Sequence, residues 1–147
     1  VNAYAQQFAW TFGYPEDGNK WSEGVLHVPV NRQLIIDLQA QDVIHSFWVP
    51  DWRIKKDAVP GLATDVIVTP DKEGTYPLIC VELCGVGHTT MRATVVVQSE
   101  AEYQAWLKKQ TTEVPEDLLL TGDQYRAAQA KKEQQSGGIE GSGVIEE

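Results

Sequence analysis

The fold of this chain can be read best from residues 75–98, Thr75-Tyr-Pro-Leu-Ile-Cys80-Val-Glu-Leu-Cys84-Gly-Val-Gly-His88-Thr-Thr-Met91-Arg-Ala-Thr-Val-Val-Val-Gln98. The two ends of this stretch are rich in β-branched and aromatic side chains, which predicts a strand over residues 75–81 and another over 92–98. Between them lies a loop, called the metal loop here (residues 80–91), that holds both cysteines of the chain and its only methionine. Thiolate and thioether are soft ligands that select copper, and imidazole suits copper as well. The stretch therefore predicts two strands joined by a copper-binding loop.

Several more short strands are predicted in the first hundred residues. Five aromatic side chains near the N-terminus fall on even positions, namely Tyr4, Phe8, Trp10, Phe12 and Tyr14. That period of two is typical of a strand with one buried face. Further strands are predicted over residues 25–30, 33–40 and 65–69, and Pro29 marks the first of these as an edge strand. Many short strands at this spacing predict an all-β sandwich or barrel.

After residue 98 the pattern becomes helical. Ser99-Glu-Ala-Glu102 is a capping box, and apolar residues follow it at helical spacing. A second such pattern at residues 121–124 would open a helix to about residue 135, and residues 137–143 have the composition of a flexible linker. We therefore expect one domain over residues 1–110 and a C-terminal extension over residues 111–147, partly helical and then flexible.

Composition excludes some classes of protein. The net charge of −9 argues against nucleic acid as a partner, because little in the chain could neutralise phosphates. An acidic surface favours a basic partner. No run of about 18 apolar residues is present, so we expect no membrane helix within the chain. The sequence begins without Met or a signal segment, and we expect it to be processed or part of a longer protein.

The upstream His45 adds a second imidazole to the ligands of the metal loop. One thiolate with two histidines and a weak methionine binds one copper, whereas two thiolates can bridge two coppers, each capped by its own histidine. Two coppers that share one odd electron carry +3, and two thiolates reduce this to +1, so such a cluster can be buried at modest cost. The alternatives are a disulfide between Cys80 and Cys84 and a zinc site, although zinc would leave Met91 unused. His27 has no soft neighbours and is interpreted as an ordinary edge histidine.

These residues resemble the copper A domain of subunit II of haem-copper cytochrome c oxidases. The metal loop is similar to that family's Cys-x-Glu-x-Cys-Gly-x-x-His-x-x-Met at every defined position. Residues 45–50 and 55–61 match a second signature, and residues 7–10 are similar to the family's aromatic segment. The resemblance covers residues 1 to about 110. It implies an all-β fold, a cupredoxin-like Greek-key β-barrel or sandwich, here with a C-terminal helical extension.

The resemblance also implies a ligand set for two copper ions: His45, Cys80, Glu82, Cys84, His88 and Met91. The two cysteines would bridge the coppers and each histidine would cap one of them. Met91 would be a weak axial ligand on the His45 copper, and the backbone carbonyl of Glu82 would fill that role on the other. The Glu82 carboxylate would reach a magnesium ion only in the intact oxidase complex, and in the domain alone we expect it to be solvated.

Further residues receive roles by the same resemblance. Electrons would enter near an aromatic group, and the donor would dock close to it, at Phe8, Trp10, Trp48 and Asp42. The family often has tryptophan at the position of Phe8, so the route by which electrons enter is left open between these aromatic residues. The face toward oxidase subunit I would carry Lys55, Asp57 and Glu82.

The implied function is electron transfer within an oxidoreductase, a cytochrome c oxidase of which this chain would be subunit II. The domain would accept electrons from cytochrome c or a similar small redox protein and pass them to the haem of subunit I. It would lie on the extracytoplasmic (periplasmic) face of a respiratory membrane, as a soluble fragment whose N-terminal membrane helices are missing. The alternatives are the copper A domain of a nitrous oxide reductase-like enzyme, a disulfide-bearing structural β-barrel module and a copper carrier.

Overall fold

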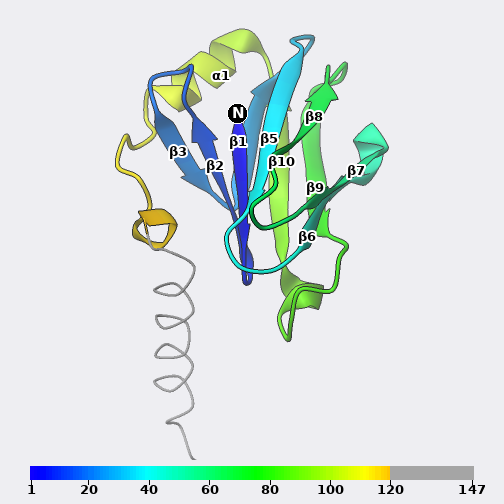
Figure 1. The fold of residues 1–147 in the computed structure, drawn as a ribbon. Coiled ribbons are helices and arrows are strands. Elements are labelled where there is room, and N and C mark those ends of the chain that lie inside the picture. Colours follow the sequence, from blue (N-terminus) through cyan, green and yellow to red (C-terminus); the bar gives the residue numbers. More distant parts are fainter. Residues whose placement is uncertain (120–147) are drawn as a thin grey trace, which may run out of the picture. The chain divides into compact units, whose positions relative to one another are not determined.

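Two five-stranded sheets make up the barrel in the computed structural model, which describes residues 1–119 (Figure 1). The first sheet has the order β3 (Lys20–Glu23), β2 (Ala9–Tyr14), β1 (Asn2–Gln6), β5 (Leu34–Ala40) and β8 (Thr64–Val68). The second has the order β4 (Val25–Pro29), β10 (Arg92–Gln98), β9 (Gly74–Cys80), β6 (His45–Val49) and β7 (Ile54–Ala58). The pairs β1–β5 and β4–β10 are parallel, and the other pairs are antiparallel.

The core lies between the two sheets and follows from the alternation of side chains along the strands. On β5 the buried residues are Leu34, Ile36 and Leu38, while the residues between them are exposed. On β10 the side chains of Val95 and Val97 are buried in the same alternating way. A period of two places every second side chain on one face, so each sheet buries one face against the other. The predicted all-β, two-sheet architecture is confirmed.

The predicted strands after residue 24 are confirmed within a residue or two, as β4, β5, β8, β9 and β10, and β4 is an edge strand. The N-terminal segment differs from the prediction. It is a hairpin of β1 and β2 with Gln7 and Phe8 in the turn, because the two strands pair antiparallel from Gln6 and Ala9 outward. Trp10 is buried on β2, whereas Tyr4 is only partly buried, since its neighbours on β1 face the core.

The predicted capping box begins a short helix, α1 (Glu100–Leu107). The Ser99 hydroxyl accepts a hydrogen bond from the Glu102 N–H at 3.3 Å, and the Glu102 carboxylate accepts one from the Ser99 N–H at 3.1 Å. Each partner satisfies an N–H group that the first turn of a helix leaves unpaired. Tyr103 and Leu107 are buried, and the partly buried Trp106 stacks on His27 of β4.

The barrel and α1 belong to one compact unit, Val1–Pro115, and Glu116–Glu147 form a second unit, of which the 3-10 turn η3 (Glu116–Leu119) is described. The first unit extends past residue 110, since the Trp21 N–H donates to the Thr111 carbonyl at 3.1 Å. The predicted helix over residues 121–135 and the linker over 137–143 lie outside the described residues. Among residues 1–119, no helix is long and apolar enough to cross a membrane.

Candidate metal centre

The predicted ligands come together at the end of the second sheet where the metal loop leaves it. Cys80 is the last residue of β9 and His45 the first of β6, and these neighbouring strands pair through Phe47 and Cys80. The metal loop folds back so that the Cys80 N–H donates to the Met91 carbonyl at 3.1 Å. A 3-10 turn, η2 (His88–Thr90), lies within the loop, just before β10. The strand order of the sheet thus brings a distant histidine to the loop.

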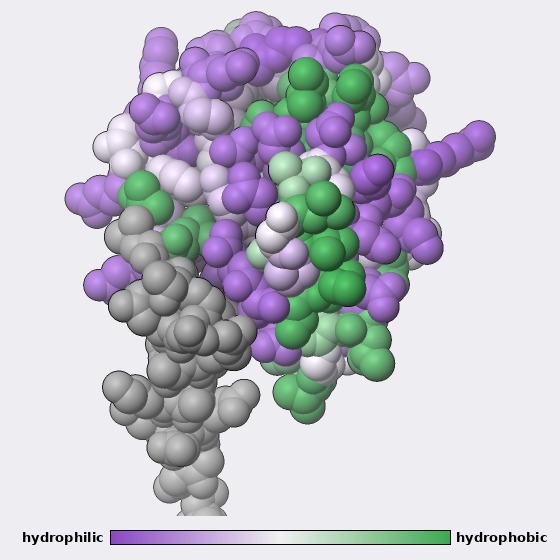
Figure 2. Space-filling view, viewed as in Figure 1, coloured by the Kyte–Doolittle hydropathy of each residue, from purple (hydrophilic) through white to green (hydrophobic). Residues whose placement is uncertain are grey.

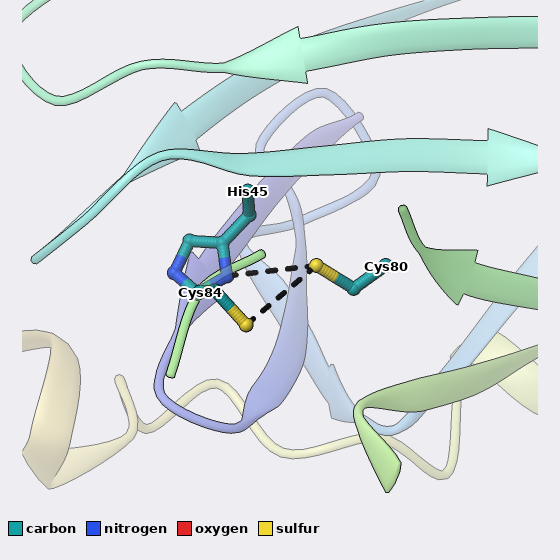
Figure 3. Close-up of side chains that lie close together, drawn as sticks. All are labelled: His45, Cys80 and Cys84. Carbon is teal, nitrogen blue, oxygen red and sulfur yellow. Dashed lines mark hydrogen bonds between the residues drawn. The ribbon is translucent and has the colours of Figure 1, made fainter. Parts of the chain in front are cut away.

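Three ligand atoms form the centre of the site (Figure 3). The Sγ atoms of Cys80 and Cys84 are 3.8 Å apart, and the Nδ1 atom of His45 is 3.8 Å from the Cys80 sulfur. A disulfide bond is about 2.05 Å long, so both thiols are free. Both cysteines are also buried, at 2% and 4% exposure. The disulfide that the structural-module alternative required is therefore not formed.

The remaining predicted ligands lie around the same two sulfur atoms. The His88 Nδ1 atom is 3.5 Å from the Cys84 sulfur, and the Met91 Sδ atom is 3.8 Å from it. The backbone carbonyl oxygen of Glu82 is 3.4 Å from the Cys80 sulfur. The Glu82 residue itself is exposed on the loop, as expected for a solvated carboxylate.

The chemistry of this donor set fits copper. Two thiols, two imidazoles and a thioether are soft or borderline ligands, which suit copper and are a poor match for calcium or magnesium. A metal–thiolate bond is about 2.3 Å long, so two sulfurs 3.8 Å apart are close enough for one metal ion to bind both. Met91 and His45 are fully buried, so the surrounding side chains shield these ligand atoms from water.

The second nitrogen of His45 is held by a carboxylate. The Nε2 atom lies 2.8 Å from Asp42 Oδ1, and an N–H donated there leaves the Nδ1 lone pair facing the sulfur. Burial favours the neutral imidazole, but the hydrogen bonds with Asp42 and Cys80 outweigh it and raise the pKa of His45. Burial alone would raise the pKa of the Asp42 carboxyl. The hydrogen bonds from His45, Gln7 and Val43 outweigh burial and lower this pKa. The hydrogen bond to the Asp42 carboxylate orients the imidazole as a ligand.

The two thiols differ in acidity. Burial raises the pKa of Cys80, but hydrogen bonds with His45 and with backbone groups outweigh this and lower the pKa to about 6. Burial and the adjacent negative charge of Cys80 raise the pKa of Cys84 to about 12. Near neutral pH the copper-free pair therefore carries one thiolate. Because a metal binds the thiolate, binding at Cys84 releases a proton.

Comparison with known proteins agrees with this geometry. A family model described as Cytochrome C oxidase subunit II, periplasmic domain, matches residues 20–99. The chain belongs to this family. It is 43% identical over 109 residues to cytochrome c oxidase subunit 2 of Thermostichus vulcanus, covering 74% of this chain and 32% of that protein. It is 36% identical over 121 residues to the subunit 2 of Synechocystis, covering 82% and 36%. The chain thus spans about a third of the length of these curated relatives.

Solved structures of this family share the fold. The periplasmic domain of subunit II of cytochrome oxidase (CoxB) from Bradyrhizobium japonicum superposes with a TM-score of 0.71 at 27% identity, covering 74% of this chain and 89% of that one. A second structure is a mixed disulfide intermediate between the thioredoxin-like protein TlpAs and subunit II. It has a TM-score of 0.66 at 28% identity and covers 74% and 87%. The cupredoxin-like fold expected from the sequence is confirmed, and the family match favours oxidase subunit II over a nitrous oxide reductase.

The structure places the expected docking residues of this subunit II domain at different depths. Asp42 is 2% exposed at its side chain and its carboxylate is occupied by hydrogen bonds, so its position differs from that of a surface docking group. Trp10 is fully buried, with its ring centroid 6.4 Å from that of His45. Phe8 and Trp48 are partly exposed. Lys55 is exposed on β7.

The expected face toward subunit I includes a second residue of β7. Asp57 is exposed, two residues along the strand from Lys55, so both side chains are available to a partner. The docking and interface roles of all these residues remain predictions.

Sequence reasoning missed one residue beside the ligands. Gln7, in the turn between β1 and β2, contacts both Asp42 and the metal loop. These contacts join positions 35 and 77 residues apart, so no local spacing indicated them. The one feature of the sequence that drew attention to Gln7 was its place at the start of residues 7–10, the stretch similar to the family's aromatic segment.

Proposed function

We propose that this domain holds two copper ions as a binuclear copper A centre and relays single electrons from cytochrome c, or a similar small redox protein, to the haem of oxidase subunit I. The observation that carries the proposal is a set of six donor atoms: two free thiol sulfurs lie 3.8 Å apart, and each of four further donors lies 3.4–3.8 Å from one of them. When bound, the copper pair takes up one electron and gives it up again. Oxygen reduction and proton pumping would belong to other parts of the oxidase.

In this proposal each ligand has one task. The thiolates of Cys80 and Cys84 would hold the copper pair, and the Nδ1 atoms of His45 and His88 would each hold one copper ion. The sulfur of Met91 would be a weak ligand beside His45, and the backbone carbonyl of Glu82 would be a weak ligand beside His88. The exposed carboxylate of Glu82 would be available to a magnesium ion in the assembled oxidase.

The burial of the site also favours electron transfer over copper delivery. Cys80 and Cys84 are 2% and 4% exposed, whereas a copper carrier must present its thiols to a partner. A buried, rigid set of ligands keeps its geometry when the charge of the centre changes, which lowers the reorganisation that limits transfer. The pairing of β6 with β9 supports this, because both strands contribute ligands.

We place the docking surface for the donor around the metal loop. Leu83 and Val86, which flank Cys84, are 77% and 93% exposed, and an apolar surface of this kind is typical of an interaction site. Apolar side chains also gather in a strip on the face shown in Figure 2. The net charge of −9 would favour a basic donor through long-range attraction. Phe8, partly exposed beside the loop, would lie between donor and centre.

The remaining partners follow from the family. The exposed β7 residues Lys55 and Asp57 would face subunit I, together with Glu82. The domain would lie on the extracytoplasmic side of a respiratory membrane, tethered by helices that belong to the longer protein. Because a related subunit II forms a mixed disulfide with a thioredoxin-like protein, we also propose that a thiol reductant keeps Cys80 and Cys84 reduced before copper binds.

Copper titration of the reduced protein tests the proposal. Two equivalents should bind, give an intense purple colour and produce an electron paramagnetic resonance signal split by two equivalent copper nuclei. Met91→Leu should keep two coppers and shift the reduction potential, whereas Cys84→Ser should abolish the binuclear signal. A wild-type signal from a single copper nucleus would contradict the binuclear centre.

A further inference from the structure

We propose that Gln7 is a positioning residue that joins the two halves of the metal centre and holds their ligands in place before copper binds. One half is His45 with its partner Asp42, and the other is the metal loop. The two halves come from separate parts of the chain, and Gln7 lies in the turn between β1 and β2 of the opposite sheet. The inference rests on the proposed copper function for its importance, but its main test is made on the copper-free protein.

The main chain of Gln7 holds the histidine half. Its N–H donates to Asp42 Oδ2 at 2.7 Å, while Asp42 Oδ1 lies 2.8 Å from His45 Nε2. The carboxylate is therefore fixed through both oxygens, one by the β1–β2 turn and one by the ligand. The Asp42 side chain is 2% exposed, so little water competes for it. A charge-assisted hydrogen bond in such a site is stronger than a neutral one.

The side chain of the same residue holds the cysteine half. Gln7 Nε2 donates to the backbone carbonyl of Cys84 at 2.6 Å, in the middle of the metal loop. Among the other backbone hydrogen bonds of the loop, one runs from the Val81 N–H to the Ser46 carbonyl of β6 at 3.2 Å, within the second sheet. The rest are local or link the two ends of the loop, as from Met91 N–H to the Gly87 carbonyl at 3.1 Å. The Gln7 bond instead anchors the loop to the first sheet, directly at a ligand.

Packing reinforces this bond. The ring of Phe8 lies on Gly85 and Gly87 so closely that a Cβ atom built on Gly85 would be 2.9 Å from Phe8 Cζ, and one on Gly87 would clash with the ring. The same Cβ on Gly85 would be 2.7 Å from Gln7 Nε2. Gly85 also has a φ of +137°, which disfavours other residues. The loop therefore lacks side chains where Gln7 and Phe8 press against it.

This arrangement predicts what losing the amide donor would do. The Cys84 carbonyl would lose its partner, and the loop would open more often, because local opening depends on the few contacts that hold a segment. A hydrogen bond of this kind contributes about 1 kcal/mol, which corresponds to about a fivefold change in the opening equilibrium.

The test is thiol labelling of the reduced, copper-free protein. Gln7→Met has a side chain of similar length without a donor, and Gln7→Glu replaces the donor by an acceptor that faces the carbonyl. Gln39→Met, at an exposed position on β5, is the matched control. Since the cysteines are at most 4% exposed, labelling by an aromatic disulfide reagent requires opening. We expect about fivefold faster labelling in both Gln7 variants and no change in the control.

A second measurement separates positioning from general stability. Labelling through loop opening should depend weakly on urea, whereas labelling through global unfolding should rise steeply with it. After copper is added, Gln7→Met should also show shifted thiolate-to-copper absorption bands. Labelling rates within twofold of wild type, or a steep urea dependence of the added labelling, would overturn the positioning role. Absence of copper uptake by the wild type would overturn the proposed function but leave the labelling result intact.

Discussion

The metal loop and α1 lie at opposite ends of the barrel (Figure 1). His45 beside the metal loop and His27 beside α1 have surroundings that are opposite in kind. At the metal end, His45 is fully buried between the carboxylate of Asp42 and the thiol of Cys80, and its pKa is raised. At the α1 end, His27 lies flat on Trp106, with ring centroids 4.0 Å apart, and its Nδ1 is 3.0 Å from a Gln98 oxygen. Burial lowers the pKa of His27, and the neutral amide offsets this only in part.

The difference shows what turns a histidine into a ligand. Both imidazoles are held by neighbours, but the neighbours of His45 are an anion on one nitrogen and a soft donor on the other. A carboxylate partner fixes the ring and increases its basicity, which favours metal binding. The partners of His27 are uncharged and include no second soft group. The first site can bind a metal, whereas the second is a packing contact.

The strongest test of this comparison replaces each of the two histidines with glutamine in a separate variant. His45→Gln should lower copper affinity by more than ~100-fold, beyond the effect of losing a residue that merely supports a ligand. His27→Gln should leave copper affinity within twofold of wild type, since no ligand atom lies near it among the described residues. Copper titration followed by visible absorption measures both. Equal losses in the two variants would contradict the assignment of His45 as the ligand.

Substitution of Asp42 should have the second largest effect on copper affinity. Asp42→Asn should lower copper affinity by about 10- to 100-fold, because the ring of His45 loses its anionic partner. Asp37→Asn, at an exposed position on β5, is the control. If Asp42 acted instead as a docking residue, the substitution would leave copper binding unchanged and weaken only the apparent affinity for the donor. Copper titration and steady-state donor oxidation by the assembled oxidase distinguish the two roles.

His45 and Asp42 also show how much of the site could be predicted from the sequence. The proposed ligands could be named from the sequence because five of the six lie within the twelve residues of the metal loop, and His45 lies in a second local motif. The strands β4, β5, β8, β9 and β10 were predictable from their β-branched or alternating side chains. The strands β6 and β7 were not predicted, because their buried residues do not alternate. The burial of the Asp42 side chain could not be predicted, because it depends on a hydrogen bond from the Gln7 N–H, 35 residues away. The N-terminal hairpin was missed because aromatic residues continue on even positions through its turn.

A change at the α1 end should affect stability and leave the metal centre unaltered. Trp106→Ala removes the ring that stacks on His27 and contacts Tyr14, with centroids 5.3 Å apart. For a partly buried aromatic residue we expect a loss of about 2 kcal/mol in the free energy of unfolding. Trp106→Phe should lose less than half of that. Urea denaturation of the copper-free protein measures the loss, and the copper spectrum of the folded variant should match wild type.

The smallest effect is the pH dependence that His27 gives to the barrel. Its folded-state pKa lies below the ordinary value of 6.5, so the unfolded chain binds a proton more readily than the folded one. The contribution of the neutral imidazole is therefore complete above pH 6.5 and is lost as the pH falls through the lower, folded-state pKa.

Since His27 is only partly buried, solvent screening limits this contribution to about 0.5 kcal/mol. Comparing wild type with His27→Gln in urea at pH 7.5 and at pH 5 isolates it, because all other titrating groups are shared. The stability difference between the two proteins should change with pH in favour of the variant under acid conditions. A change in favour of the wild type would mean that the imidazole gains an anionic partner on folding, as His45 does, and the contrast between the two ends would fail.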